Sequence, residues 1–377
     1  MVMVAVPPKK VHPRLEQRWR RYVGVFVAAS VFVLGIARQR SWTLSWLLNQ
    51  GKINSQSVET TVTEPGSSVV QTKPQVQRET IRDTDVLFAE PSSKNVKGLL
   101  FVAHGCSHSH TDWFSDCGDC IGLPEERAIV QIGLNHGLVV VAISSSDRMS
   151  KCWNLENDIE PVGQVLQELA KRYQPPNQGN DSHQIPVFAF GASSGGAFVS
   201  GIATPLKDRF GMALSGFLSQ IAARQTDEAA LCQVYITMNG DPGTDARAQQ
   251  LVSQLASTTT TATKVPMKHI RIPPLPILPE FFASRIPEIT AKDSARMFQA
   301  LRDGGLLDKG GYLLESPRRS NWRNALLAAT PPIPAVQQDS LVADASSISE
   351  VMNVADGRHE MTRDGVQEAL EFCLSGS

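Results

Sequence analysis

Short apolar runs alternate with longer amphipathic stretches along most of this chain. Three of the runs, Gly98–Ala103, Leu138–Ile143 and 187–190, contain no polar side chain. Runs of this length without polar alternation are typical of strands that are buried on both faces of a parallel sheet. Between the second and third runs, apolar residues recur at helical spacing over about 158–173. The pattern therefore predicts an α/β protein with a mostly parallel central sheet flanked by helices.

The same rhythm continues on both sides of these runs. A helix is expected to begin at Pro124, which stands before two acids, and to end near Gly137. The pattern also predicts strands at 85–89, 217–221 and 234–238, a last strand within 264–272, and a C-terminal helix through 366–372.

The first 21 residues are rich in basic side chains, and an apolar segment at 22–37 follows them without a charge. We interpret this segment as an uncleaved signal anchor that crosses the membrane once. A cleaved signal peptide, a transit segment and a buried helix are the alternatives. Because the positive residues precede the apolar segment, residues 1–21 are expected in the cytosol and the remainder in the lumen of the endoplasmic reticulum, the Golgi or a later secretory compartment. Residues 38–80 are expected to form a stem, and 81–377 the folded domain.

The third apolar run ends in a Gly-x-Ser-x-Gly pattern made by Gly191, Ser193 and Gly195. An apolar strand that breaks at glycines around a serine is typical of a nucleophile elbow, a sharp turn between strand and helix that exposes the hydroxyl. An ordinary glycine-rich and serine-rich loop is the alternative. The elbow interpretation needs an acid and a histidine later in the chain, in that order.

Both partners are present after the serine. The segment that follows the 234–238 strand offers two acids, Asp241 and Asp245, and His359 lies just before the last helix. We favour Asp245 as the acid, because Asp241 precedes Pro242 and Gly243, where an aspartate commonly caps a turn. Asp241 remains the alternative. The other histidines of the expected folded domain precede the acid or stand in a poor context; they are His104, His108, His110, His136, His183 and His269.

The strand at Gly98–Ala103 ends in His104, Gly105 and Cys106. A loop at this place commonly supplies half of an oxyanion hole, so the backbone N–H of Cys106 is expected to act with that of Ser194 on the charged oxygen of the transition state. For His104 a structural role is favoured over a catalytic one.

Six cysteines are present. Disulfides are the favoured interpretation if the domain is lumenal, and a zinc site near His108 and His110 or free thiols are the alternatives. Asn180 begins an Asn-Asp-Ser sequon, which is a candidate glycosylation site.

Proline-rich turns and short helical pieces interrupt the strand and helix rhythm over about 273–347. One such piece is expected at 294–302. We favour a cap over the active site for this insertion, with a peripheral insertion as the alternative.

The composition argues against a nucleic-acid-binding protein. The 377 residues carry a formal net charge of −1 and are 42% hydrophobic, which suits a globular core and gives no reason to expect nucleic acid as a partner. No cofactor is expected. A small-molecule or lipid-like acyl compound is the expected substrate, and the membrane is the expected partner of the N-terminal segment.

Leu99 through Phe114, Gly191 through Gly196 and His359 give the chain a resemblance to the α/β-hydrolase superfamily. More narrowly, 103–113 with 122–126 resembles a group of uncharacterised α/β-hydrolase-fold proteins of plants and algae. The resemblance covers roughly 86–374 and implies the fold and a Ser-Asp-His triad, but no substrate.

The sequence therefore predicts a membrane-anchored serine hydrolase with an acyl-enzyme intermediate. Its substrate is an ester, thioester or amide, with a carboxylic ester favoured over a peptide. The alternative is a hydrolase fold that has lost its activity and serves as a binding or scaffold protein.

Overall fold

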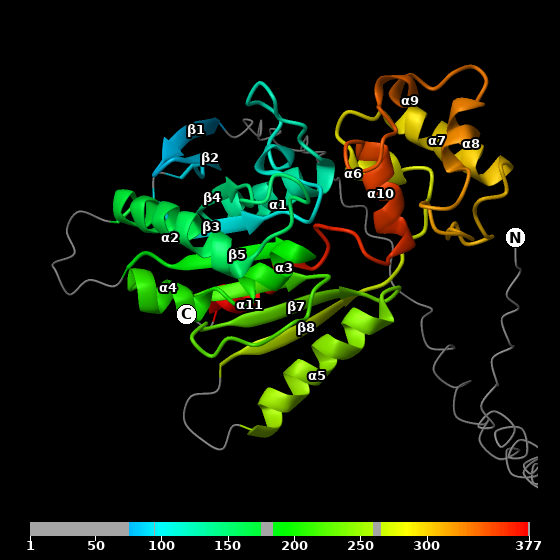
Figure 1. Ribbon diagram of the computed structural model, residues 1–377. Helices are drawn as coiled ribbons and strands as arrows, with labels where there is room; N and C mark the ends of the chain where they lie inside the picture. Colours follow the sequence, from blue (N-terminus) through cyan, green and yellow to red (C-terminus); the bar gives the residue numbers. More distant parts are fainter. Residues whose placement is uncertain (1–74, 94, 175–183, 259–264, 376–377) are drawn as a thin grey trace, which may run out of the picture. The chain divides into compact units, whose positions relative to one another are not determined.

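The structure is a computed structural model, and it describes residues 75–93, 95–174, 184–258 and 265–375. Figure 1 shows a central sheet with helices on both of its faces. Its eight strands follow the order β1-β2-β4-β3-β5-β6-β7-β8. The pairings β1 with β2 and β2 with β4 are antiparallel, and all the others are parallel. The predicted fold class, a mostly parallel sheet flanked by helices, is confirmed.

The strands lie close to the positions that the apolar runs predict. Their bounds are β1 (Val76–Ile81), β2 (Thr84–Ala89), β3 (Gly98–Ala103), β4 (Leu138–Ile143), β5 (Val187–Ala192), β6 (Gly216–Gln220), β7 (Gln233–Met238) and β8 (Met267–Ile272).

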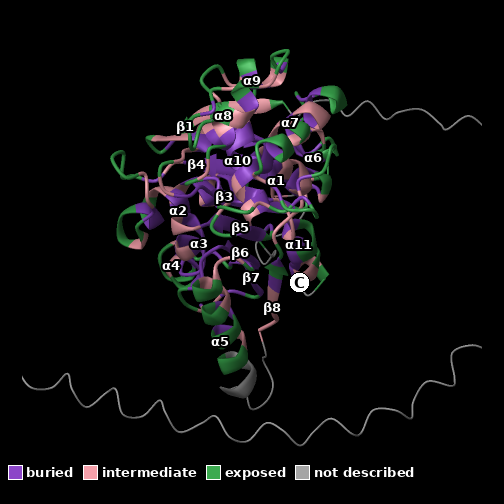
Figure 2. Cartoon of the chain, turned by 90° about the vertical axis from the view of Figure 1, so that its right-hand side faces the viewer, coloured by how far each residue is buried: buried purple, intermediate pink, exposed green. Residues whose placement is uncertain are grey.

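Alternate residues of each buried strand serve two separate cores. In β3, Leu99 and Phe101 belong to one hydrophobic cluster, while Leu100 and Val102 belong to the other. The helices α1 (Pro124–Asn135) and α11 (Val366–Ser375) cover the second cluster. The first cluster is covered by α2 (Leu155–Arg172), α3 (Ser194–Val199), α4 (Ala203–Phe210) and α5 (Pro242–Thr258). Figure 2 shows that buried positions concentrate in the sheet between these layers.

The segment between β8 and His359 forms a helical insertion with a hydrophobic cluster of its own, centred on residues such as Phe282, Trp322 and Val351. Figure 1 shows its helices gathered beside the sheet, in yellow to red-orange. They are α6 (Phe281–Arg285), α7 (Ala291–Asp303), α8 (Trp322–Leu327), α9 (Pro334–Gln338) and α10 (Ser347–Asp356). The helix expected at 294–302 lies within α7, and the insertion extends past the predicted limit of 347 to the end of α10.

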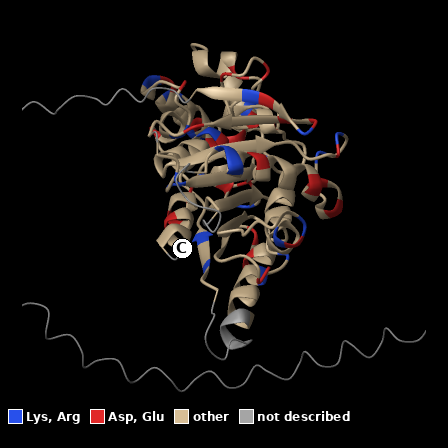
Figure 3. Ribbon diagram, turned by 90° about the vertical axis from the view of Figure 1, so that its left-hand side faces the viewer, with Lys and Arg blue, Asp and Glu red and all other residues tan. Residues whose placement is uncertain are grey.

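A buried ion-pair network fastens this insertion to the sheet domain. Arg285 of α6 donates to Glu125 of α1 at 3.1 Å and to Asp364 at 2.6 Å. Arg285 and Glu125 are both buried, so each charge depends on the other for stabilisation. In Figure 3, by contrast, most charged residues lie on helices and loops around strands that are largely uncharged.

Two elements differ from the sequence-based expectation. Residues 76–80, which were expected in the stem, belong to β1, an edge strand whose side chains are mostly polar and partly exposed. The long helix α5 was not expected at all, because Pro242, which looked like part of a loop, occupies its first position.

All six cysteines form disulfides, namely Cys106 with Cys152, Cys117 with Cys120, and Cys232 with Cys373. This agrees with the favoured interpretation of the cysteines and leaves no thiol for the zinc alternative.

The N-terminal predictions concern residues 1–74, so the segment 22–37 lies outside the described residues. Within the part of the chain that the structure describes, no helix is both long and apolar enough to cross a bilayer. The sequon at Asn180 also lies outside the described residues.

Candidate active site

Ser193 stands at the strained turn between β5 and α3. Its backbone has a φ of 54° and a ψ of −115°, a conformation that a β-carbon disfavours and that residues other than glycine rarely adopt. The flanking glycines are required by close contacts. A β-carbon at Gly191 would lie 2.3 Å from the carbonyl oxygen of Gly195, and one at Gly195 would lie 2.3 Å from that of Ala103. The Gly-x-Ser-x-Gly pattern therefore forms the elbow geometry, with the hydroxyl at the carboxyl end of β5.

The side chains of Ser193, His359 and Asp241 form a chain of hydrogen bonds. Ser193 Oγ lies 3.1 Å from His359 Nε2, and His359 Nδ1 lies 3.1 Å from Asp241 Oδ2. With Asp241 ionised, the proton on Nδ1 points at the carboxylate and Nε2 is free to accept the proton of the serine. This is the arrangement in which a histidine can activate a hydroxyl.

The structure brings Asp241, and not the favoured Asp245, into contact with His359. Asp245 lies one turn further along α5, where it accepts hydrogen bonds from Thr237 at 2.9 Å and from Arg271 at 2.8 Å. Asp241 caps the helix as well, accepting from the backbone N–H of Thr244 at 3.2 Å through its other oxygen. The capping role that counted against Asp241 is therefore compatible with its contact to the histidine.

A close approach of two loops brings Asp241 to His359. The N–H of Gly240 donates to the carbonyl oxygen of Gly357 at 2.8 Å. A β-carbon at residue 240 would lie 2.4 Å from that same oxygen, so only glycine fits there. Gly357 itself ends α10 with a φ of 64°, which a glycine adopts without strain.

Gln220, the last residue of β6, joins the serine loop to the histidine loop. Its buried side chain donates to the carbonyl oxygen of Thr362 at 2.7 Å and accepts from the N–H of the same residue at 2.9 Å. Its carbonyl oxygen accepts the N–H of Ser193 at 2.9 Å. One residue therefore holds the backbone near both Ser193 and His359.

The electrostatics suit an ionised acid. Partial burial raises the pKa of Asp241, but hydrogen bonds from His359 and Thr244 outweigh that effect, so the pKa of Asp241 lies below its ordinary value. The carboxylate is thus charged at neutral pH and able to stabilise a protonated His359.

The expected oxyanion donors lie beside the serine, since Cys106, Ser193 and Ser194 all border one cavity. Among the hydrogen bonds of the described residues, none uses the backbone N–H of Cys106 or of Ser194. Two such amides could donate to the oxygen of a bound carbonyl group. The disulfide from Cys106 to Cys152 ties the first of them to the loop after β4.

His104 supports this loop and does not reach the reacting groups. It is fully buried, its Nε2 accepts the N–H of Ser145 at 3.1 Å, and its Nδ1 consequently donates to the carbonyl oxygen of Gly105 at 2.7 Å. Burial lowers the pKa of His104 to about 4, so the ring is neutral. The structural role favoured from the sequence agrees with these contacts.

The cavity at the elbow has a volume of about 440 Å³. Besides Ser193 and His359 it is lined by apolar side chains, by the first turn of α5 and by two arginines, Arg224 and Arg247. No residue of the insertion lines it. A smaller cavity of about 160 Å³ on the other side of His359 is bordered by Arg318 and Asn353 of the insertion. The insertion therefore flanks the histidine, and its described residues do not close the cavity at Ser193.

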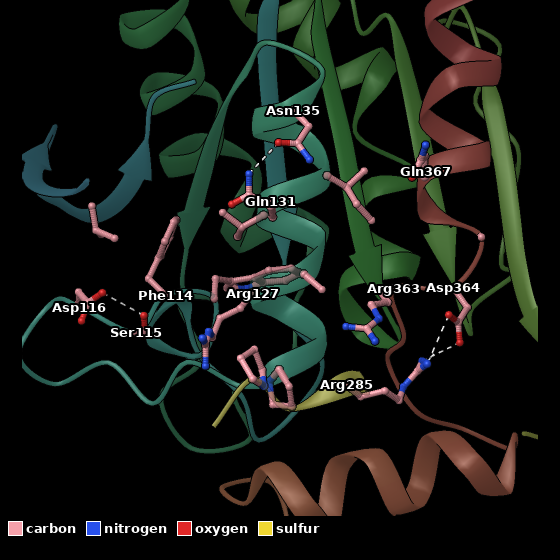
Figure 4. Close-up of a pocket in the computed structure, with 18 residues that line it drawn as sticks. Phe114, Ser115, Asp116, Arg127, Gln131, Asn135, Arg285, Arg363, Asp364 and Gln367 are labelled. Atoms are coloured by element: carbon pink, nitrogen blue, oxygen red, sulfur yellow. Dashed lines mark hydrogen bonds and ion pairs between the residues drawn. The ribbon is translucent and has the colours of Figure 1, made fainter. Parts of the chain in front are cut away.

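A larger cavity of about 700 Å³ lies elsewhere, between α1, the loop near Phe114 and the start of α11. Figure 4 shows Arg127, Arg285 and Arg363 around it, with Arg285 paired to Asp364. Neither a serine at a strained turn nor a histidine borders this cavity. Of these two cavities, the one of about 440 Å³ is bordered by both Ser193 and His359.

Sequence patterns predicted Ser193, His359, Cys106 and Ser194, with Asp241 as the second choice of acid, and the structure brings these five residues together. They missed the residues that position or surround the site. Gln220 carries no motif, and the two arginines stand in unremarkable polar stretches. Gly240 precedes Asp241 in the sequence. A glycine at this position is a signal that could have indicated the close approach of its backbone to another loop.

The sheet order and the serine elbow after β5 give the chain an α/β-hydrolase fold. No protein-family model and no curated protein matches the sequence. Solved structures do match. Dienelactone hydrolase from Anabaena variabilis is 15% identical, with 54% of this chain and 88% of that chain covered and a TM-score of 0.34. An esterase from Pyrobaculum calidifontis is 13% identical, with 53% and 75% covered and a TM-score of 0.35. TT1662 from Thermus thermophilus is 13% identical, with 54% and 90% covered and a TM-score of 0.35. The narrower resemblance to plant and algal proteins stays a prediction.

Proposed function

We propose that this protein is a serine hydrolase that cleaves a carboxylic ester, or a related thioester or amide, through an acyl-enzyme. The observation that carries the proposal is the continuous contact from Ser193 through His359 to Asp241 at an elbow that borders a cavity. Each of these three side chains has the hydrogen-bond donor or acceptor that its proposed role requires.

In the proposed mechanism, Ser193 Oγ attacks the carbonyl carbon while His359 Nε2 takes the hydroxyl proton. Asp241 holds the histidine in the tautomer that leaves Nε2 free and stabilises its positive charge. The N–H groups of Cys106 and Ser194 donate to the oxyanion, and His359 then protonates the leaving alcohol. Water, activated by the same histidine, releases the acid from Ser193 and restores the hydroxyl.

The alternative is a hydrolase fold that binds without catalysis. That alternative would gain from a serine out of reach of its histidine or from an elbow without a cavity. The 3.1 Å contact between Ser193 and His359 and the cavity of about 440 Å³ favour the enzyme instead.

We also propose that the domain works in an oxidising, lumenal compartment, anchored by residues 22–37. Three disulfides suit such a compartment. Expression of the full chain with a tag at each end, followed by protease protection of microsomes, would test this. The prediction is a protected C-terminal tag and an accessible N-terminal tag.

Hydrolysis of short 4-nitrophenyl esters tests the proposed activity. The wild type is expected to release nitrophenol, and Ser193→Ala is expected to be reduced to the background rate. The control is Ser146→Ala, an exposed serine whose hydroxyl takes part in none of the hydrogen bonds of the described residues. Equal rates for Ser193→Ala and the wild type would contradict the proposal.

A further inference from the structure

The cavity at Ser193 carries an imbalance of charge. Arg224 follows β6 and Arg247 lies on the second turn of α5, and both line the cavity. None of the lining residues is an aspartate or a glutamate. The other arginines near His359, Arg318 and Arg358, are different, because each lies within ion-pair distance of an acid.

The two arginines lie together without a carboxylate partner. The guanidinium of Arg247 donates to the carbonyl oxygen of Arg224 at 3.4 Å and to Gln250 at 3.1 Å. Arg224 donates from its side chain in no hydrogen bond of the described residues, and neither arginine is in an ion pair among those residues. Both arginines therefore line the cavity with no carboxylate partner among the described residues.

The first turn of α5 adds to the positive electrostatic potential of the cavity. Gly243 and Thr244 line the cavity, and the helix of 17 residues that they begin directs its positive end there. Asp241, at the helix start, is already engaged by His359 and Thr244. The remaining walls are small and apolar, formed by residues such as Ala197, Ala222 and Ala223. A compact substrate with a negative group at one end matches this combination.

We infer that the enzyme prefers acyl esters that carry a second, anionic group such as a carboxylate, which Arg224 and Arg247 bind while the ester carbonyl lies at Ser193. This inference rests on the proposed function and names its substrate class. Guanidinium groups bind carboxylates by charge-assisted, often bidentate hydrogen bonds, so the arginines act as specificity residues.

Pairs of isosteric esters test the inference on either side of the scissile bond. The acyl-side pair is 4-nitrophenyl hydrogen glutarate and its glutaramate amide, and the alcohol-side pair is 4-acetoxybenzoate and 4-acetoxybenzamide. For at least one pair, kcat/KM of the wild type is expected to be about tenfold higher for the carboxylate, mostly through KM. The preference is expected to fall as salt rises from about 0.05 to 0.5 M, because the arginines are exposed.

The double variant Arg224→Gln, Arg247→Gln is expected to bring this ratio of carboxylate to carboxamide close to one. Arg209→Gln, which removes an exposed charge on α4, is the control for net charge and is expected to keep the ratio. Using a ratio within each variant removes the effect of partial misfolding, and the matching single variants show which arginine contributes more.

The outcomes separate the two proposals. Hydrolysis of both members of each pair that depends on Ser193 but shows no preference for the carboxylate would overturn the inference alone. A preference that survives in the double variant would also overturn it. Absence of any hydrolysis that depends on Ser193, in a folded protein, would overturn the proposed function and the inference with it.

Discussion

Two histidine and aspartate pairs lie near the start of α5, and only one of them adjoins a serine at a strained turn. In the first, His359 lies 3.1 Å from Asp241 and contacts Ser193. In the second, His269 of β8 lies 3.3 Å from Asp245, and the hydroxyl of Thr237 lies 2.7 Å from the same ring nitrogen. Both groups therefore contain a hydroxyl, an imidazole and a carboxylate.

What separates the pairs is access and backbone geometry. Thr237 is fully buried inside β7, whereas Ser193 projects from a strained turn into a cavity. Asp245 also forms an ion pair with Arg271 of β8, so its carboxylate binds side chains of the sheet. Contact among a hydroxyl, an imidazole and a carboxylate is therefore not by itself a reason to propose catalysis. The exposed hydroxyl and the free amides beside it give the first group its proposed chemistry.

The largest contrast is expected between the two histidines. His359→Gln should lower kcat for a 4-nitrophenyl ester by about five orders of magnitude, because the serine loses its base. His269→Gln should change kcat by less than about tenfold, because it lies outside the proposed catalytic chain. Steady-state kinetics of the two purified variants measure this difference, and similar losses in both would break the comparison.

The two acids should differ nearly as much. Asp241→Asn is expected to reduce kcat by about 10⁴-fold, since an asparagine stabilises neither the required tautomer of His359 nor its charge. Asp245→Asn is expected to lower stability modestly, through weaker binding of Arg271, and to retain most of kcat. Steady-state kinetics measure kcat of both variants, and thermal unfolding measures their stability, so that the two effects can be distinguished. A larger kcat loss for Asp245→Asn would restore the sequence-based preference.

The disulfide beside the oxyanion loop should have an intermediate effect. Removing Cys106 and Cys152 together, as alanines, frees the loop that holds one amide donor, and kcat is expected to fall about tenfold. A fully lost donor would cost more, on the order of 2.7–4 kcal/mol, but His104 still holds this loop through Ser145. The matched control removes Cys117 and Cys120, which are paired with each other away from the serine cavity. Equal losses in both double variants would show that the effect is general destabilisation.

The smallest effect concerns the acid stability that the partly buried pair of His269 and Asp245 contributes. Burial lowers the pKa of His269 below its ordinary value of 6.5, although Asp245 opposes that shift. The unfolded chain therefore binds a proton at this residue more readily than the folded one, so its contribution to stability is present above pH 6.5 and is lost as pH falls. Urea unfolding at pH 7.5 and pH 5 should show a smaller acid loss for His269→Gln than for the wild type. An identical loss in both would contradict this assignment.

The sheet and the serine could be predicted because their causes are local. Continuous apolar runs report strands buried on both faces, and the glycines at 191 and 195 report a turn without room for side chains. His359 followed from its place after the acids and before the last helix.

The choice of acid could not be predicted in the same way. It depends on where α5 begins and on the approach of Gly240 to Gly357, a contact between residues 117 positions apart in the numbering. The edge strand β1 was missed because its polar, half-exposed face lacks an apolar run. The arginines of the cavity were missed because nothing in their local sequence distinguishes them from solvated charges.

The most direct test of the central claim is a map of the site that a fluorophosphonate modifies. Such a probe reacts with a serine whose hydroxyl is activated by a neighbouring histidine. The folded wild type is expected to gain one adduct, located by peptide mass spectrometry on Ser193, and His359→Gln is expected to lose it. An adduct that is absent from the folded wild type, lies on another residue or persists without His359 would contradict the account.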